Sequence, residues 1–102
     1  MNHISDPDRT YDDAAHEAVE LANRLAGQDT EADPWDIADG LLAGAIHYWL
    51  YSRQPCGNPH CEDCSAYSTA ELRVAELKKL VEQLAFNSDY YHTPHDSNVG
   101  RA

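Results

Sequence analysis

All three cysteines of this chain fall within nine positions, in the segment CGNPHCEDC between Cys56 and Cys64. Cys61 and Cys64 have the C-x2-C spacing by which two thiolates hold one metal ion, and Cys56 precedes them. The Gly-Asn-Pro sequence between the first two cysteines is typical of turns. Because a polar, turn-rich loop is a poor place to bury free thiols, we expect Cys56, Cys61 and Cys64 to bind a metal ion.

Zinc is the expected ion because it favours four tetrahedral sulfur or nitrogen ligands. Three thiolates leave one ligand to be supplied by a histidine. His60 is nearest in sequence, although its side chain and that of its neighbour Cys61 should diverge. His47, shortly before the loop, is an equally good candidate, and His16 ranks third. The cysteine spacing also begins the plant-type iron–sulfur pattern, but that pattern needs a distant fourth cysteine, which the chain lacks.

A zinc ion in this loop could be structural or catalytic. A catalytic site keeps one coordination position for water, and Glu62 and Asp63 would then be candidate bases. Three thiolates, however, make the metal a weak Lewis acid, and no substrate-binding motif lies nearby. We therefore expect a structural zinc and assign no catalytic residue.

Three stretches of the chain carry apolar residues at helical spacing, over 11–26, 34–53 and 69–88. No strand-like alternation appears. The cysteine loop over 54–67 separates the second and third stretches, and the tail over 92–102 has no periodicity and should be flexible. The chain is thus predicted to be one domain of the all-α class, a small three-helix bundle with a metal-binding cysteine loop between the second and third helices.

Start and stop signals support these three helices. Thr10 resembles a helix cap for the first, and Gly27 is well placed to end it. Asp33 before Pro34 is the clearest start, because proline suits the first helical position. The segment Ser-Thr-Ala-Glu over 68–71 fits a capping box for the third helix.

The second predicted helix is apolar around more than half of its circumference, which indicates neighbours on several sides. Gly40 and Gly44 share the remaining strip. Each glycine costs a helix interior about 1 kcal/mol. Close approach of another helix backbone is a possible reason for their presence.

Negative charge is concentrated in the first 39 residues, which hold eleven acidic side chains against two arginines, a net charge of −9 within a total of −11. Such a surface repels nucleic-acid phosphates and anionic lipids, so neither nucleic acid nor a membrane is an expected partner. A basic protein surface is the expected partner, and a homo-oligomer is possible. The polar N-terminus is unlike a signal peptide, and no apolar run is long enough to span a membrane, so a cytoplasmic location is expected.

Pairs of acidic residues spaced by three also occur on the first two predicted helices. The stretches EAVELA (17–22) and WDIADGLL (35–42) resemble the acidic helices of the MazG-like all-α nucleotide pyrophosphohydrolases. That resemblance implies magnesium-dependent hydrolysis of nucleoside triphosphates, with the metal held by the acids at the matching positions, which are Glu17, Glu20, Asp36 and Asp39. Asp36 stands where the family has glutamate, and a cysteine loop is not part of the family pattern.

Three functions are therefore weighed. The leading one is a zinc-stabilised, non-enzymatic module that binds a basic protein as a regulator or inhibitor. The first alternative is the MazG-like magnesium-dependent hydrolase. The second alternative is a metal or redox sensor that uses the cysteine loop.

Overall fold

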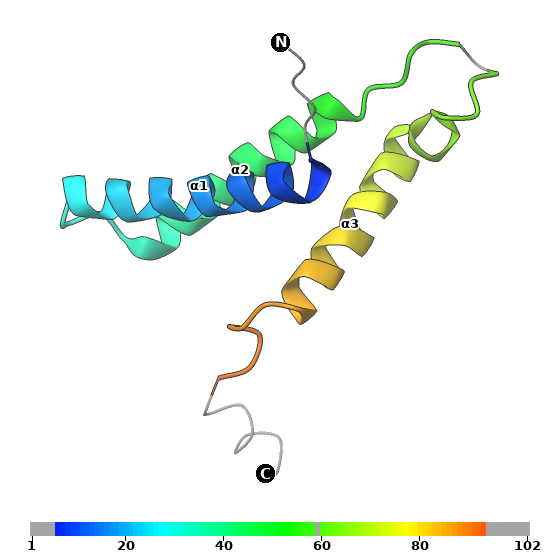
Figure 1. Cartoon of the computed structure of the whole chain (residues 1–102). Coiled ribbons are helices and arrows are strands. Elements are labelled where there is room, and N and C mark those ends of the chain that lie inside the picture. Colours follow the sequence, from blue (N-terminus) through cyan, green and yellow to red (C-terminus); the bar gives the residue numbers. More distant parts are fainter. Residues whose placement is uncertain (1–5, 59, 94–102) are drawn as a thin grey trace. The chain divides into compact units, whose positions relative to one another are not determined.

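The structure, a computed structural model, describes residues 6–58 and 60–93. Within them the chain forms three α-helices and one short 3-10 helix, with no strand (Figure 1). These elements are α1 (Pro7–Gln28), α2 (Pro34–Ser52), η1 (Ser65–Tyr67) and α3 (Ala70–Phe86). The all-helical class, with three α-helices and the cysteine loop between the second and third, is confirmed.

The chain divides into two compact units, Met1–Trp49 and Leu50–Ala102. The first holds α1 and most of α2, and the second holds the cysteine loop, η1 and α3. The expectation of one domain stays a prediction. Of the tail expected over 92–102, residues 94–102 lie outside the described part.

Helix α1 begins earlier than its apolar pattern indicates, at Pro7 rather than at residue 11. The carboxylate of Asp6 accepts a hydrogen bond from the backbone N–H of Asp8 at 3.0 Å, and Pro7 takes the first helical position. Thr10 is therefore inside the helix and does not cap it. The helix also passes through Gly27 and ends at Gln28, two residues beyond the predicted end at residue 26.

The predicted start of α2 at residue 34 is confirmed, whereas α3 begins at Ala70 instead of residue 69 and is capped by Thr69 instead of Ser68. The Asp33 carboxylate accepts from the N–H of Trp35 at 2.9 Å, so Asp33 caps α2. The Thr69 hydroxyl accepts from the N–H of Leu72 at 3.1 Å, so Thr69 caps α3.

In the first unit, α1 and α2 lie side by side as an antiparallel pair joined by the short segment 29–33 (Figure 1). An apolar cavity of about 560 Å³ follows their contact, and we call it the α1/α2 groove. Its walls hold one acid among apolar and small residues, which are Ala18, Leu21, Leu25, Asp36, Ile37, Gly40, Leu41, Gly44 and Ala45.

The α1/α2 groove is open to solvent. Among the described residues no side chain is fully buried, and even Leu21, Ile37 and Leu41 are only half-buried. A Cβ atom added at Gly40 or Gly44 would meet no atom within 4 Å. Within the described part, therefore, no neighbouring helix explains these two glycines.

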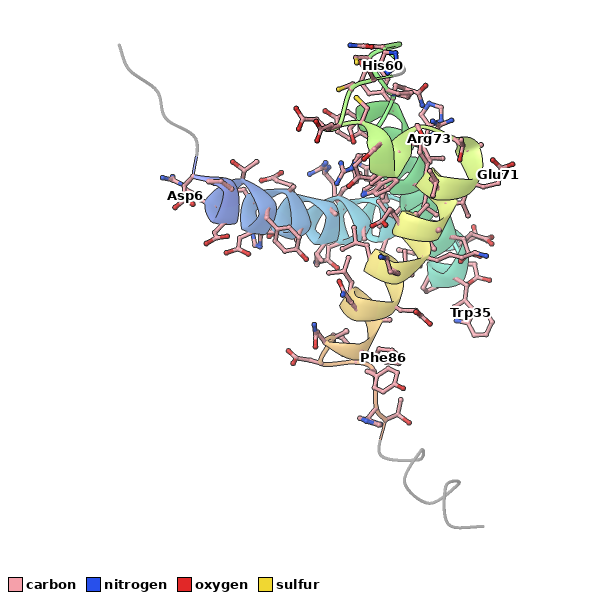
Figure 2. All side chains as sticks on the ribbon, turned by 90° about the vertical axis from the view of Figure 1, so that its right-hand side faces the viewer. Asp6, Trp35, His60, Glu71, Arg73 and Phe86 are labelled. Atoms are coloured by element: carbon pink, nitrogen blue, oxygen red, sulfur yellow. The ribbon has the colours of Figure 1, made fainter. Side chains whose placement is uncertain are left out.

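In the second unit, η1 packs against α3. The chain turns after Phe86, the last residue of α3 (Figure 2). The ring of Tyr91 meets that of Phe86 edge to face, with 5.1 Å between the centroids. No helix in the described ranges has the length and apolar character needed to cross a membrane.

Candidate metal centre

The three cysteines come together in the loop between α2 and η1. The Sγ atoms of Cys56, Cys61 and Cys64 all lie within 4.8 Å of one another. Cys56 is exposed, and the other two are half-buried. Zinc–sulfur bonds of about 2.3 Å in a tetrahedral site place thiolates about 3.8 Å apart, so this spacing fits a shared metal ion after small movements.

Turn chemistry shapes this loop as the sequence indicates. Gly57 adopts φ = +91°, in the region that only glycine enters without strain. The Asn58 side chain then accepts a hydrogen bond from the N–H of His60 at 3.0 Å, and its backbone carbonyl accepts from the N–H of Cys61 at 3.1 Å. These bonds reverse the chain and bring Cys61 toward Cys56.

Backbone hydrogen bonds support the thiols from the other side of the loop. The N–H of Cys56 points to Sγ of Cys64 at 3.5 Å, which favours negative charge on that sulfur. The carbonyl of Cys64 accepts from the N–H of Tyr67 at 2.9 Å, which links the last cysteine to η1. The metal-binding segment is thus continuous with the 3-10 helix.

The thiols also influence one another. Hydrogen bonding with the Cys64 side chain lowers the pKa of Cys61 below that of an ordinary thiol. At Cys64 the Cys56 N–H acts to lower the pKa, but hydrogen bonds with the other two thiols, together with burial, raise it overall.

Two arginines contact Tyr67 at the end of the loop, and no sequence motif predicts either contact. Arg73, on α3, donates from Nη1 to the backbone carbonyl of Tyr67 at 2.8 Å (Figure 2). Arg53, just after α2, lies over the Tyr67 ring at 5.7 Å from the centroid. Tyr67 thus connects the residues before the loop with those after it.

The fourth ligand stays a prediction. Within the described part, only the three cysteines gather their ligand atoms into a possible metal site. His60 is exposed, and its ring is not in that group. His47 lies on α2 in the first unit. The ring of His16, also in the first unit, lies 3.3 Å from the carboxylate of Glu20.

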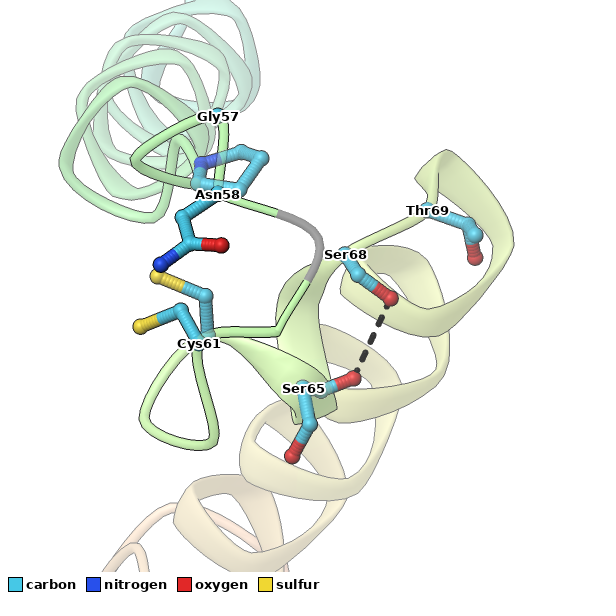
Figure 3. Close-up of a pocket in the computed structure, with 8 residues that line it drawn as sticks. Gly57, Asn58, Cys61, Ser65, Ser68 and Thr69 are labelled. Atoms are coloured by element: carbon cyan, nitrogen blue, oxygen red, sulfur yellow. Dashed lines mark hydrogen bonds between the residues drawn. The ribbon is translucent and has the colours of Figure 1, made fainter.

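A cavity of about 420 Å³ borders the thiols of Cys61 and Cys64 (Figure 3). Most of its other walls carry amide or hydroxyl groups, and the lining is completed by Pro55, Gly57, Asn58, Ser65, Ser68 and Thr69. The Ser68 hydroxyl donates to the carbonyl of Ser65 at 3.2 Å, which holds this wall together (Figure 3). The site therefore opens to solvent through this cavity, which we call the chamber.

The acidic residues at the positions that match the MazG-like family do not form a cluster as the three cysteines do. Among the described residues, no three carboxylates bring their oxygens together as a metal site. Asp36 lines the α1/α2 groove, whereas Glu20 lies beside His16.

Fold and site together define the class of the protein, an all-helical chain with a loop of three cysteines that can bind a metal ion. No protein-family model, curated protein or solved structure matches the chain.

Proposed function

We propose that the protein is a zinc-stabilised helical module that binds a basic protein surface and acts as a regulator or inhibitor without catalysis. The observation that carries this proposal is the α1/α2 groove. It combines an open apolar floor with the most acidic part of the chain. Zinc in the cysteine loop has a structural part in the proposal, because it would hold the connection between α2 and α3.

The groove needs an occupant on physical grounds. Exposed apolar surface of this kind is usually an interaction site, and two helices without a buried side chain gain little stability from their own contact. Further apolar residues are exposed beside it, with Leu42 at 53% and Tyr48 at 69%. Covering these side chains would supply most of the binding energy.

Charge selects the kind of occupant. Residues 1–49 carry eleven acidic side chains and two arginines, so a second acidic copy would be repelled where a basic partner is attracted. A partner helix with apolar residues on one face and lysine or arginine on the other matches both properties.

A designed probe tests this function. The probe is a helical peptide with leucines on one face and lysines on the other, and the control has the same composition in scrambled order. The amphipathic peptide should bind more tightly, its affinity should fall as salt increases, and Gly44→Leu should abolish binding by filling the groove. Equal binding of the two peptides would show that the groove has no part in recognition.

The MazG-like hydrolase remains the alternative, and it makes a distinct demand. It requires magnesium-dependent release of pyrophosphate from a nucleoside triphosphate, with loss of turnover in Glu17→Ala and Asp39→Ala. Turnover that both substitutions remove would replace the proposal.

A further inference from the structure

The cysteine loop supplies three of the four ligands that a tetrahedral metal ion needs, and this inference rests on the metal site proposed above. In the second unit, the described residues gather three thiols and no histidine nitrogen or carboxylate oxygen. A tetrahedral ion takes four ligands, so one donor must come from outside this set.

His60 is poorly placed to be that donor. The Asn58 side chain holds the backbone N–H of His60 at 3.0 Å, and the next residue, Cys61, turns toward the other thiols. His60 lies in the turn that the hydrogen bond from the Cys61 N–H to the Asn58 carbonyl closes at 3.1 Å, and its ring nitrogens are not among the gathered ligand atoms. The exposure of His60 agrees with this arrangement.

The chamber beside the thiols offers another source. Its volume of about 420 Å³ exceeds that of several water molecules, each of which occupies about 30 Å³ in the liquid. Both Cys61 and Cys64 line it, so a metal held by these sulfurs would be reached from the chamber (Figure 3). A small molecule can therefore enter and meet the metal.

Two residues that line the chamber keep hydrogen-bond donors for a ligand. Oδ1 of Asn58 already accepts a backbone hydrogen bond, which leaves the side-chain NH2 group as a donor. Oγ1 of Thr69 accepts from Leu72, so its O–H can also donate. No described carboxylate lines this chamber, although the chain as a whole is acidic.

We propose that the metal of the cysteine loop takes its fourth ligand from a small thiol that enters through this chamber. Three thiolates make the ion soft, and soft ions favour a further sulfur donor over oxygen. The thiol binds as its thiolate and releases its proton to solvent, with no change in the oxidation state of the metal or of sulfur. The side-chain NH2 group of Asn58, which lies beside the sulfurs in Figure 3, is the donor that would offset the added negative charge.

Cobalt replaces zinc as a spectroscopic probe in the test, because sulfur-to-cobalt charge-transfer and d–d absorption report the ligands. Full-length protein is loaded with one Co²⁺ without oxygen and titrated with 2-mercaptoethanol, and imidazole and azide are used as the competing ligand classes. We expect a saturable rise in charge-transfer absorption with the thiol alone, while gel filtration shows that cobalt stays on the protein. His60→Ala, His47→Ala and the double variant should give the wild-type spectrum.

The results separate this inference from the metal site on which it rests. A spectrum that changes in either histidine variant would mean that the protein supplies the fourth ligand, and the inference would be wrong while the metal site stands. A response to imidazole or azide but not to the thiol, or removal of cobalt by the thiol, would also overturn it. Failure of the chain to bind cobalt or zinc would overturn both the inference and the site.

Discussion

The backbone N–H of Cys56 donates a hydrogen bond to Sγ of Cys64 across the cysteine loop, with 3.5 Å between the two atoms. Because of this hydrogen bond, we expect Cys56 and Cys64 to contribute unequally to zinc affinity. Cys56→Ala removes one sulfur but keeps the N–H that supports Cys64. Cys64→Ala removes a sulfur and the acceptor of that bond, so we expect it to weaken zinc binding more. Competition with a chromophoric chelator measures both affinities, and equal losses would show that the hydrogen bond contributes nothing.

Removal of zinc should destabilise the second unit. Metal-binding energy is partly folding energy, because the unfolded chain has no assembled site. Chelation should therefore lower the melting temperature and speed hydrogen exchange in the loop over 54–67. Triple Cys→Ser protein treated with the same chelator is the control and should show no change. Unaltered melting of the wild type after metal loss would contradict a structural part for zinc.

Gly57→Ala should weaken metal binding through the backbone alone. A Cβ atom at Gly57 would meet nothing within 4 Å, so its cost arises from φ = +91°, where an L-residue pays roughly 1–2 kcal/mol. That cost corresponds to a roughly 5- to 30-fold loss of zinc affinity. Gly27→Ala is the matched control, since Gly27 has helical backbone and open space, and it should leave zinc affinity unchanged.

Arg73→Met should loosen the end of the loop. The substitution keeps an apolar stem but loses the part-buried hydrogen bond to the Tyr67 carbonyl, and a bond from a charged donor is worth about 1.5–3 kcal/mol. Urea denaturation of the zinc-loaded protein measures the loss. Lys79→Met, which removes an exposed cation on the same helix, should change stability much less. Similar losses of stability in the two variants would mean that the loss of a positive charge, and not of the hydrogen bond to Tyr67, causes the effect.

Gly44→Ala should separate stability from binding. Alanine favours a helix interior over glycine by about 1 kcal/mol, and the added Cβ meets nothing, so urea denaturation should show a more stable protein. The same methyl group narrows the α1/α2 groove and should weaken binding of the amphipathic peptide. A variant that is more stable and binds the peptide as well as the wild type does would mean that the peptide does not bind in the α1/α2 groove.

Charge reversal in the first unit needs positions that do not also cap helices. Asp29 and Asp33 accept backbone hydrogen bonds from Glu31 and Trp35, so lysine there would damage the fold. Asp12→Lys and Glu31→Lys are better choices. We expect this pair to lower peptide affinity at low salt and to have little effect at high salt, with unchanged circular dichroism.

Much of the fold and of the site can be predicted from local chemistry. Asp33 with Pro34 sets the start of α2, and the cysteine spacing brings the three thiols together. The start of α1 differs from the prediction because the Asp6–Pro7 pair, which repeats the Asp–Pro signal of α2, begins the helix before the apolar pattern does. The contact of Arg73 with Tyr67 could not be predicted, because it depends on how η1 turns the chain.

The Thr69 cap lies directly after the cysteine loop, so the structure of the loop affects the formation of α3. A helix of 17 residues is marginal in water, because its first turn must fix several residues before any bond between turns repays the loss of entropy. Here the hydrogen bond from the Tyr67 N–H to the Cys64 carbonyl, the Thr69 cap and the hydrogen bond from Arg73 already orient the chain where α3 begins. A metal bound to the thiols would act as a nucleation template, so the helical content of α3 would track metal supply.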